Sequence, residues 1–151
     1  MIIRKADRKD AWGVLALALL LWPDRETNPL FEEISNLLDD PESGVFVAAD
    51  GKVLAGFAQC AMRHDSVQGS LTGPVGYLEG IFVREAYRRQ GVARALTDAC
   101  ERWAKAQNCT EFASDCPLEN PLAIRFHHGA GFHESNRIVY FIKRLQEESN
   151  A

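Results

Sequence analysis

The sequence predicts a mixed α/β (α+β) fold in which helices flank a central β-sheet. Three observations predict this class. Apolar residues recur at helical spacing in some segments, they alternate or run unbroken in others, and turn-forming residues separate the two kinds of segment. The expected order along the chain is β-α-α-β-β-β-α-β-α-β. Because 151 residues suffice for one hydrophobic core, we expect a single domain over residues 1–146 and a polar tail over residues 147–151.

Cap and turn residues mark the ends of the elements in the first half of the chain. Asp7 is the expected N-cap of the first helix, which ends before Pro23. Asp50-Gly51 is a hairpin signal, and the polar stretch from Arg63 to Pro74 is expected to form an exposed loop beside a ligand site. The predicted elements are a strand over 2–4, helices over 8–21 and 29–38, and strands over 45–49, 53–62 and 75–83.

Glycine, asparagine and proline mark the elements of the second half. Gly80, inside a predicted strand, indicates a β-bulge or a place where another group approaches the backbone. Asn120 followed by Pro121 predicts the start of a helix. The remaining predicted elements are a turn over 84–90, a helix over 91–107, a strand over 111–115, a helix from 120 to 129–131 and a strand over 137–145. This last strand is apolar on both faces, so we expect either a central buried strand or a homodimer interface with strand exchange.

The charge balance and the cysteines narrow the class of function. The chain has 21 acidic and 17 basic side chains, which argues against a nucleic-acid partner and is compatible with a cationic ligand. Its four cysteines form no C-x-x-C pair, so we expect reduced thiols and no metal site. The apolar run from Val14 to Trp22 is too short to span a membrane, and the charged start is unlike a signal peptide. We therefore expect a cytoplasmic protein without a membrane partner.

The segment Arg88-Arg89-Gln90-Gly91-Val92-Ala93 lies between a predicted strand and a predicted helix. The first turn of a helix has unpaired N–H groups and the positive end of the helix dipole, and small residues let an anion approach them. The two arginines add positive charge. This pattern predicts a pyrophosphate site, although a surface turn with two solvated arginines gives the same pattern. Neither a P-loop lysine nor a G-x-G-x-x-G fingerprint is present.

Two longer motifs extend this segment. Residues 78–83 and 87–96, followed by Asn120-Pro121-Leu122-Ala123 through Phe126-His127 to Gly131-Phe132, resemble the two signatures of the GNAT superfamily of N-acetyltransferases. The resemblance covers nearly the whole chain. It implies the GNAT fold and acetyl-CoA as co-substrate, with a strand that pairs with the pantetheine arm and a turn that binds the pyrophosphate. The residues that it assigns to the cofactor are Ile81, Phe82, Val83, Arg88, Arg89, Gln90, Gly91, Val92, Ala93, Arg94 and Asn120.

Within that superfamily the chain is most similar to the small aminoglycoside 6'-N-acetyltransferases. The matching strings are Leu21-Trp22-Pro23, Gly56-Phe57-Ala58, Arg63-His64-Asp65, Leu78 to Val83, Arg102-Trp103 and Ala113-Ser114-Asp115. The resemblance implies transfer of the acetyl group to the 6'-amino group of an aminoglycoside by direct attack in a ternary complex, which confers antibiotic resistance. It also implies a homodimer.

An aminoglycoside carries several ammonium groups, so carboxylates and flat aromatic faces are expected around it. Trp22, Asp65, Glu79 and Asp115 are the candidates. Glu79 and Asp115 fall in predicted strands, where an acid is unusual without a function, and are expected to meet at the acetyl group. Each candidate has an alternative: Trp22 belongs to the core, Asp65 is a solvated loop acid, and Glu79 and Asp115 are buried acids whose hydrogen bonds come from amides at strand ends. Two further positions that face the acceptor in the family depart from it: Ser66 replaces the usual tyrosine and Asn136 an expected acid.

The amine must lose a proton before it attacks the thioester, and a nearby carboxylate suits that role. The N–H of Ile81 is expected to stabilise the developing oxyanion. His127 holds the position where the family usually supplies a tyrosine that protonates the leaving thiolate; a helix-surface histidine is the alternative. Cys116 is the one nucleophile near Asp115 that would contradict direct transfer. Two other functions stay open: acetylation of a polyamine, an amino acid or a protein N-terminus, and an acyl-CoA-binding module without turnover.

Overall fold

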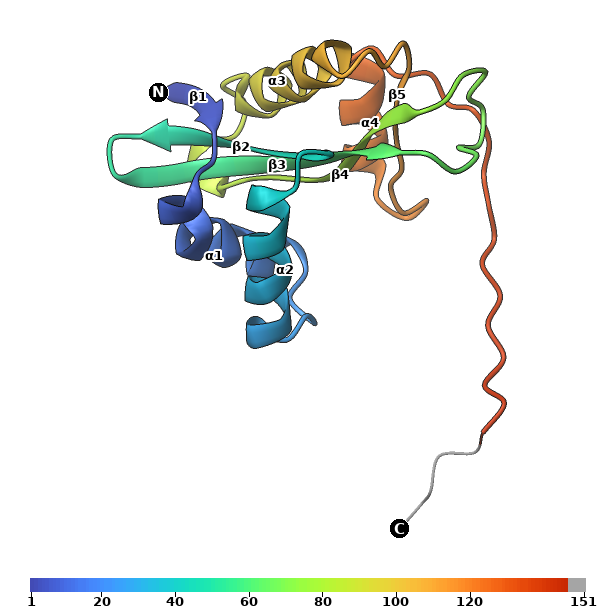
Figure 1. The fold of residues 1–151 in the computed structure, drawn as a ribbon, viewed down its shortest axis with the longest axis horizontal. Coiled ribbons are helices and arrows are strands. Elements are labelled where there is room, and N and C mark those ends of the chain that lie inside the picture. The colour runs from blue at the N-terminus through green and yellow to red at the C-terminus, as the bar shows by residue number, and fades with distance from the viewer. Residues whose placement is uncertain (147–151) are drawn as a thin grey trace.

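A five-stranded sheet in the order β1-β2-β3-β4-β5 forms the centre of the computed structural model, which describes residues 1–146 (Figure 1). The strands are β1 (Ile2–Lys5), β2 (Ser43–Asp50), β3 (Val53–Arg63), β4 (Val75–Val83) and β5 (Phe112–Ser114). Neighbours among the first four strands are antiparallel, whereas β5 runs parallel to β4. The alternating and continuous apolar runs of the sequence are therefore strands, as predicted.

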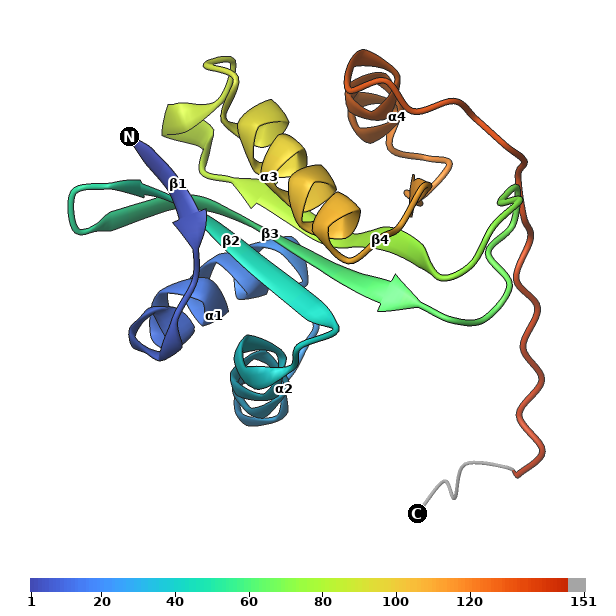
Figure 2. The same ribbon diagram turned by 45° about the horizontal axis from the view of Figure 1, so that its top comes forward.

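Helices cover both faces of this sheet. Helices α1 (Ala11–Leu21) and α2 (Thr27–Asp39) lie on one face and α3 (Val92–Ala106) crosses the other, with α4 (Pro121–Gly129) beyond β5 (Figures 1 and 2). Each face has its own core. Leu17 packs with Phe57 beneath α1, and Leu96 packs with Cys60 beneath α3. Within residues 1–146, no helix combines the length and apolar character needed to cross a membrane.

The start of α1 is held by an ion pair beneath a capping box. The Asp7 carboxylate accepts from the N–H of Lys9, and the Asp10 carboxylate accepts from the N–H of Asp7 at 2.9 Å. Arg4, on β1, donates two hydrogen bonds to Asp10 at 2.7 and 2.9 Å and thereby lowers the pKa of that buried carboxyl. The predicted cap at Asp7 is confirmed, although it opens a short 3-10 turn (Arg8–Asp10) that precedes α1.

β4 contains a bulge, and its two sides are paired unequally. Gln59 lies opposite Gly80 and Cys60 lies opposite Leu78, so Glu79 is the extra residue of the bulge predicted at Gly80. On its other side β4 pairs with β5 only from Gly76 to Leu78, after which the two strands part. Among the residues that the structure describes, 79–83 have no strand partner on that side. The parting of β4 and β5 positions the candidate site.

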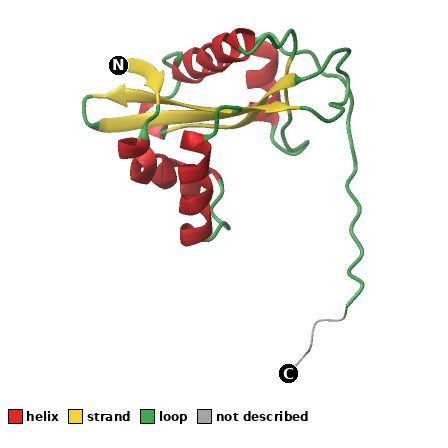
Figure 3. Cartoon of the chain, in the orientation of Figure 1, coloured by secondary structure: helices red, strands yellow, loops and turns green. Residues whose placement is uncertain are grey.

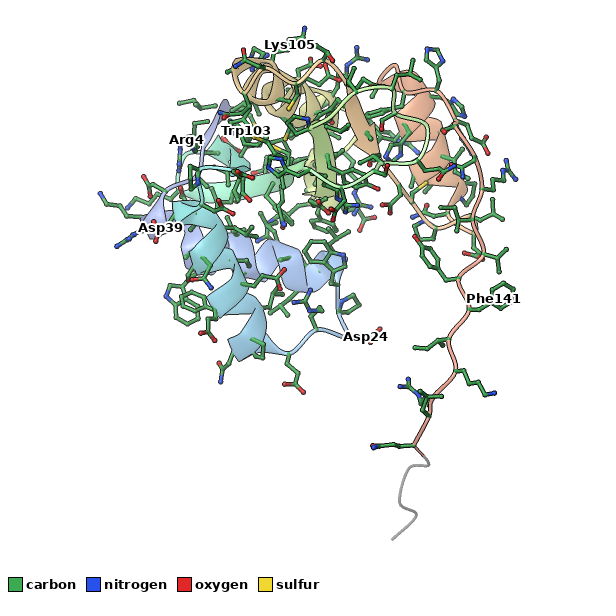
Figure 4. All side chains as sticks on the ribbon, turned by 45° about the vertical axis from the view of Figure 1, so that its right-hand side comes forward. Arg4, Asp24, Asp39, Trp103, Lys105 and Phe141 are labelled. Carbon is green, nitrogen blue, oxygen red and sulfur yellow. The ribbon has the colours of Figure 1, made fainter. Side chains whose placement is uncertain are left out.

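The predicted strand over residues 137–145 is wrong. The chain runs from residue 133 to 146 as an extended arm that leaves the body of the molecule and pairs with no described strand (Figures 1 and 3). Its apolar side chains are exposed, Tyr140 by 89%, Phe141 by 92% and Ile142 by 85%, and Phe141 projects away from the sheet (Figure 4). An extended segment becomes a β-strand only when a neighbouring strand pairs with it through backbone hydrogen bonds, and the arm has no such neighbour within the described residues. The predicted tail over 147–151 lies outside the described residues.

Candidate active site

The turn between β4 and α3 has the backbone expected of an anion site. Gly91 is the N-cap of α3 with a φ of +78°, and Arg89 has a φ of +62°. These left-handed residues turn the chain so that α3 begins at an exposed position. Nε of Arg88 donates to the carbonyl of Val83 at 2.9 Å, which ties the turn to the end of β4. The free N–H groups at the start of α3 and the nearby guanidinium groups fit a pyrophosphate.

Other residues assigned to the cofactor have partners within the protein. Arg94 donates to the carbonyl of Gly129 at 2.7 Å and to the Asp98 carboxylate at 3.3 Å, so it joins α3 to α4. The side chain of Asn120 accepts from the N–H of Ala123 at 3.1 Å and caps α4, as predicted from its neighbour proline. Gln90 donates to a carbonyl within its own turn at 3.3 Å. Val92 is buried and Ala93 half-buried beneath the first turn of α3.

Ile81 and Val83, which are predicted to contact pantetheine, lie on β4 beyond the parting from β5, as does Phe82, which is also assigned to the cofactor. Their backbone on that side therefore meets no strand within residues 1–146. A linear molecule with amide groups fits such an edge because it can form the missing ladder. The geometry thus joins a strand edge to an anion site at the next turn, the arrangement that pantetheine and pyrophosphate require.

Glu79 and Asp115 are linked through two residues that the sequence analysis did not assign to the site. Arg63, the last residue of β3, donates to both oxygens of Glu79 at 2.9 and 2.8 Å. Its guanidinium carbon lies 3.5 Å from the centre of the Tyr77 ring. The Tyr77 hydroxyl donates to the Asp115 carboxylate, and burial together with that carboxylate raises the pKa of the phenol.

The prediction that Glu79 and Asp115 both lie within strands is only partly correct. Glu79 is half-buried, but Asp115 lies one residue past the end of β5 and is exposed. β5 ends sooner than predicted because β4 accompanies it only to Leu78. The available signal for Arg63 was its place in the string Arg63-His64-Asp65. Nothing in the linear sequence indicates that it reaches Glu79, because that depends on the register of β3 against β4.

His127 is a residue of α4, and its ring contacts the end of β5, where β4 and β5 part. Its Nδ1–H donates to the carbonyl of Ala123 at 2.7 Å, and its Nε2 lies 2.8 Å from Oγ of Ser114. Ser114 in turn donates to the carbonyl of Leu78 at 3.3 Å. The ring meets Phe132 edge-on, with centroids 5.2 Å apart. These contacts anchor the half-buried His127 side chain beside the end of β5, and its role in proton transfer stays a prediction.

The other four positions predicted to contact the acceptor lie just after α1, in the loop that follows β3 and at the start of the arm. The ring of Trp22 lies 2.8 Å from where a Cβ on Gly80 would be, so it packs on the bulge. Asp65 and Ser66 are exposed in the loop over 64–74, and Asn136 is exposed where the arm begins. Loop and arm lie side by side (Figures 1 and 2), and any Cβ on Gly69 would collide with Ser135.

Glu111 holds the C-terminal part of the loop over 64–74 by hydrogen bonds. Its carboxylate accepts from the N–H groups of Leu71 at 2.8 Å and of Thr72 at 2.6 Å. The Thr72 hydroxyl also donates to this carboxylate, and this bond together with the two from the backbone lowers the pKa of Glu111 and holds the loop beside β5. No role was predicted for Glu111. The one indication in the sequence is that a carboxylate stands directly before the start of β5.

Cys116 follows Asp115 but has the wrong environment for a nucleophile. Burial, with a contribution from the Asp115 charge, raises the pKa of its thiol. A raised thiol pKa leaves less thiolate at neutral pH, and the thiolate is the reactive form. Over the described part of the chain, no group of three histidine, cysteine or acidic side chains is arranged to hold a metal ion.

Comparison with known proteins agrees with this geometry. Residues 12–132 match the family described as Acetyltransferase (GNAT) family. Aminoglycoside N(6')-acetyltransferase type 1 of Stenotrophomonas maltophilia is 43% identical over 146 residues, which cover 95% of this chain and 94% of that protein. The enzyme of the same name from Serratia marcescens is 40% identical, with 96% of this chain and 99% of that protein covered.

Solved structures give the same result. AAC(6')-Iy in complex with the bisubstrate analog CoA-S-monomethyl-acetylneamine superposes with a TM-score of 0.91 at 34% identity, and the match covers 95% of this chain and 97% of that one. AAC(6')-Ih from Acinetobacter baumannii superposes with a TM-score of 0.88 at 37% identity, covering 96% and 99%. The chain therefore belongs to the GNAT acetyltransferase family, and within it to the aminoglycoside N(6')-acetyltransferases.

Proposed function

We propose that this protein transfers the acetyl group of acetyl-CoA to the 6'-amino group of aminoglycosides and thereby confers resistance to them. The observation that carries the proposal is the pair of carboxylates, Glu79 and Asp115, at the parting of β4 and β5. They lie between a strand edge and turn that fit coenzyme A and an exposed loop that faces solvent. The family membership, and the coenzyme A and aminoglycoside groups in the analog bound by AAC(6')-Iy, support the same reaction.

The cofactor is assigned to β4 and the following turn. Ile81, Phe82 and Val83 offer the strand edge to the pantetheine arm. The turn from Arg88 through Gly91, with the N–H groups of Val92, Ala93 and Arg94, binds the pyrophosphate. Asn120 borders the far side of the cofactor at the start of α4.

The reaction needs one group that removes a proton and one that returns it. A carboxylate of the Glu79–Asp115 pair removes a proton from the substrate ammonium, directly or through water. The backbone N–H of Ile81 stabilises the charge that develops on the carbonyl oxygen. In its doubly protonated form His127 gives the Nε2 proton to the leaving sulfur, while its Nδ1–H stays hydrogen-bonded to the carbonyl of Ala123. The protonated thiol of Cys116 supports direct transfer without a covalent enzyme intermediate.

Trp22, Asp65, Ser66 and Asn136 are proposed to line the acceptor site with the two acids. Trp22 offers an aromatic face beside the bulge, and Asp65 adds a carboxylate from the loop. Ser66 and Asn136 supply no charge and no ring, so we expect a weaker cation pocket or a shifted preference among aminoglycosides.

We also propose a cytoplasmic homodimer in which residues 1–146 form one domain. The arm over 133–146 supports this assembly because it exposes several apolar side chains, among them Ile138, Phe141 and Leu145. Such a run is stabilised when it pairs with the sheet of a second copy. The free thiols of the four cysteines suit the reducing cytoplasm.

A spectrophotometric assay of free coenzyme A tests the proposed function. We expect release with kanamycin and tobramycin, weaker or no release with spermidine and peptide amines, and a product acetylated at the 6' position by mass spectrometry and NMR. Glu79→Ala and Asp115→Ala should lose turnover and keep their affinity for coenzyme A. Release of coenzyme A with spermidine or a peptide, and with no aminoglycoside, would show that the acceptor is another amine. Binding of coenzyme A without release in the presence of any amine would favour the binding module.

A further inference from the structure

Arg63 is held on two sides at once. Its guanidinium forms a forked pair with the Glu79 carboxylate at 2.9 and 2.8 Å, and its Cζ lies over the Tyr77 ring, 3.5 Å from the ring centre. The side chain of Arg63 is 42% exposed and that of Glu79 is 25% exposed. A planar cation fixed by a fork and a stack has little freedom to move. Arg63 therefore defines where the Glu79 carboxylate lies.

The two carboxylates of the site consequently differ in charge balance. Both oxygens of Glu79 already accept from a guanidinium, which neutralises the charge of that carboxylate. Within residues 1–146, Asp115 accepts from the hydroxyl of Tyr77, a neutral donor, and forms no ion pair. The three groups Arg63, Glu79 and Asp115 together thus carry one negative charge rather than two. A cationic acceptor meets one acid that is paired with a guanidinium and a second acid that has no ion-pair partner among the described residues.

We propose that Arg63 is a positioning residue of the acceptor site, which acts through Glu79 and sets the charge of the pocket. This inference rests on the proposed function. The fork holds Glu79 in the orientation that turnover needs, because a small displacement of a positioned group costs catalytic rate. The cation lowers the attraction of the pocket for ammonium groups and so limits the affinity for a polycation. Fork and charge are separable, since lysine keeps the charge but cannot form the fork.

A stability role predicts something different. A partly exposed ion pair contributes little to folding, so removal of Arg63 should leave the protein folded. Arg8 supplies the matched control because it makes an equally forked pair with Asp39, at 3.1 and 2.9 Å. Asp39 lies at the end of α2, on the face of the sheet away from α3 and apart from α4 (Figure 4).

The experiment compares Arg63→Gln, Arg63→Lys and Arg8→Gln by steady-state kinetics with tobramycin and by thermal unfolding of the full chain. For Arg63→Gln we expect kcat to fall by about tenfold, the tobramycin KM to fall by about threefold and the acetyl-CoA KM to stay constant. Arg63→Lys should restore the tobramycin KM but not kcat. Arg8→Gln should match the wild type in all three constants.

Three results would overturn the inference: an Arg63→Gln variant within twofold of wild type in both tobramycin constants, full recovery of kcat by lysine, or a loss of thermal stability well beyond that of Arg8→Gln. Each requires that the wild-type chain acetylates tobramycin. If the wild type releases no coenzyme A with any aminoglycoside, the proposed function itself fails, which is a distinguishable outcome.

Discussion

Nε2 of His127 lies 2.8 Å from Oγ of Ser114, and this contact joins α4 to the last residue of β5. Because Ser114 also donates to the carbonyl of Leu78, the imidazole is tied to the point where β4 and β5 part. The Nδ1–H bond to Ala123 fixes which nitrogen faces the site. The proposed proton donor is thus held by α4 and by the end of β5, two elements that are not adjacent in the chain.

Removal of this histidine should lower the rate of the chemical step. We expect His127→Ala to reduce kcat by about 10²-fold and Ser114→Ala to reduce it less, since serine only orients the ring. The KM for acetyl-CoA should change little in both variants. Steady-state kinetics checks this, with His128→Ala as the control because His128 is exposed beside it. Equal losses in His127→Ala and His128→Ala would refute the assignment.

Gly91 should be required for its backbone conformation. An alanine there has free space around its Cβ, but it must adopt a φ of +78°, which costs about 1 kcal/mol. We expect Gly91→Ala to raise the KM for acetyl-CoA and leave the acceptor KM unchanged. Gly129→Ala is the matched control, because Gly129 also has open space and its φ lies outside the left-handed range. A change of the acetyl-CoA KM in the control alone would contradict the anion site.

The ion pair of Asp10 should make stability depend on pH. Arg4 lowers the pKa of Asp10 below its ordinary value of 3.8 in the folded protein. The carboxylate therefore stabilises the fold above that value, and the contribution is lost as the pH falls through the lower, folded pKa. We expect Asp10→Asn to reduce the free energy of unfolding by about 1–2 kcal/mol at pH 7.

Urea unfolding of wild type and Asp10→Asn at pH 7, 5 and 3 measures this difference. It should be similar at pH 7 and 5 and smaller at pH 3. Asp39→Asn is the control, since its pair with Arg8 is exposed and contributes little. A difference that is unchanged at pH 3 would show that Asp10 acts through its shape and not its charge.

The arm should carry the dimer contact. We expect the wild-type chain to sediment as a dimer and Phe141→Asp to sediment as a monomer, because a charge opposes burial of that position. Leu71→Asp is the control, since Leu71 is also exposed, by 95%, but lies in the loop. Analytical ultracentrifugation distinguishes the two states, and a wild-type monomer at micromolar concentration would exclude the proposed homodimer.

Local signals predicted much of the fold. The strand from Val75 to Val83 has the bounds that its apolar run and flanking residues indicate, and Asp7 and Asn120 are caps because a side-chain oxygen there satisfies free N–H groups. Gly80 marked the bulge because only a residue without Cβ leaves room for the Trp22 ring.

Features that depend on how the strands pair could not be predicted from the sequence. The residues over 137–145 have strand composition, yet composition does not say which strand they pair with or in which chain. The link between Arg63 and Glu79 depends on a register in which Arg63 lies opposite Val75 and a bulge follows along β4. A shift by one residue would send that side chain to the other face of the sheet.

The unequal pairing of β4 also bears on how long the enzyme lasts. Beyond Leu78 one edge of this strand meets no strand of the described chain, and a ligand that completes it binds only the folded protein. Saturation at 100 times Kd would add about 2.7 kcal/mol to the free energy of unfolding. Less unfolded protein is then open to proteases at any moment. We therefore expect a larger acetyl-CoA pool to slow degradation of the enzyme as well as to speed its turnover.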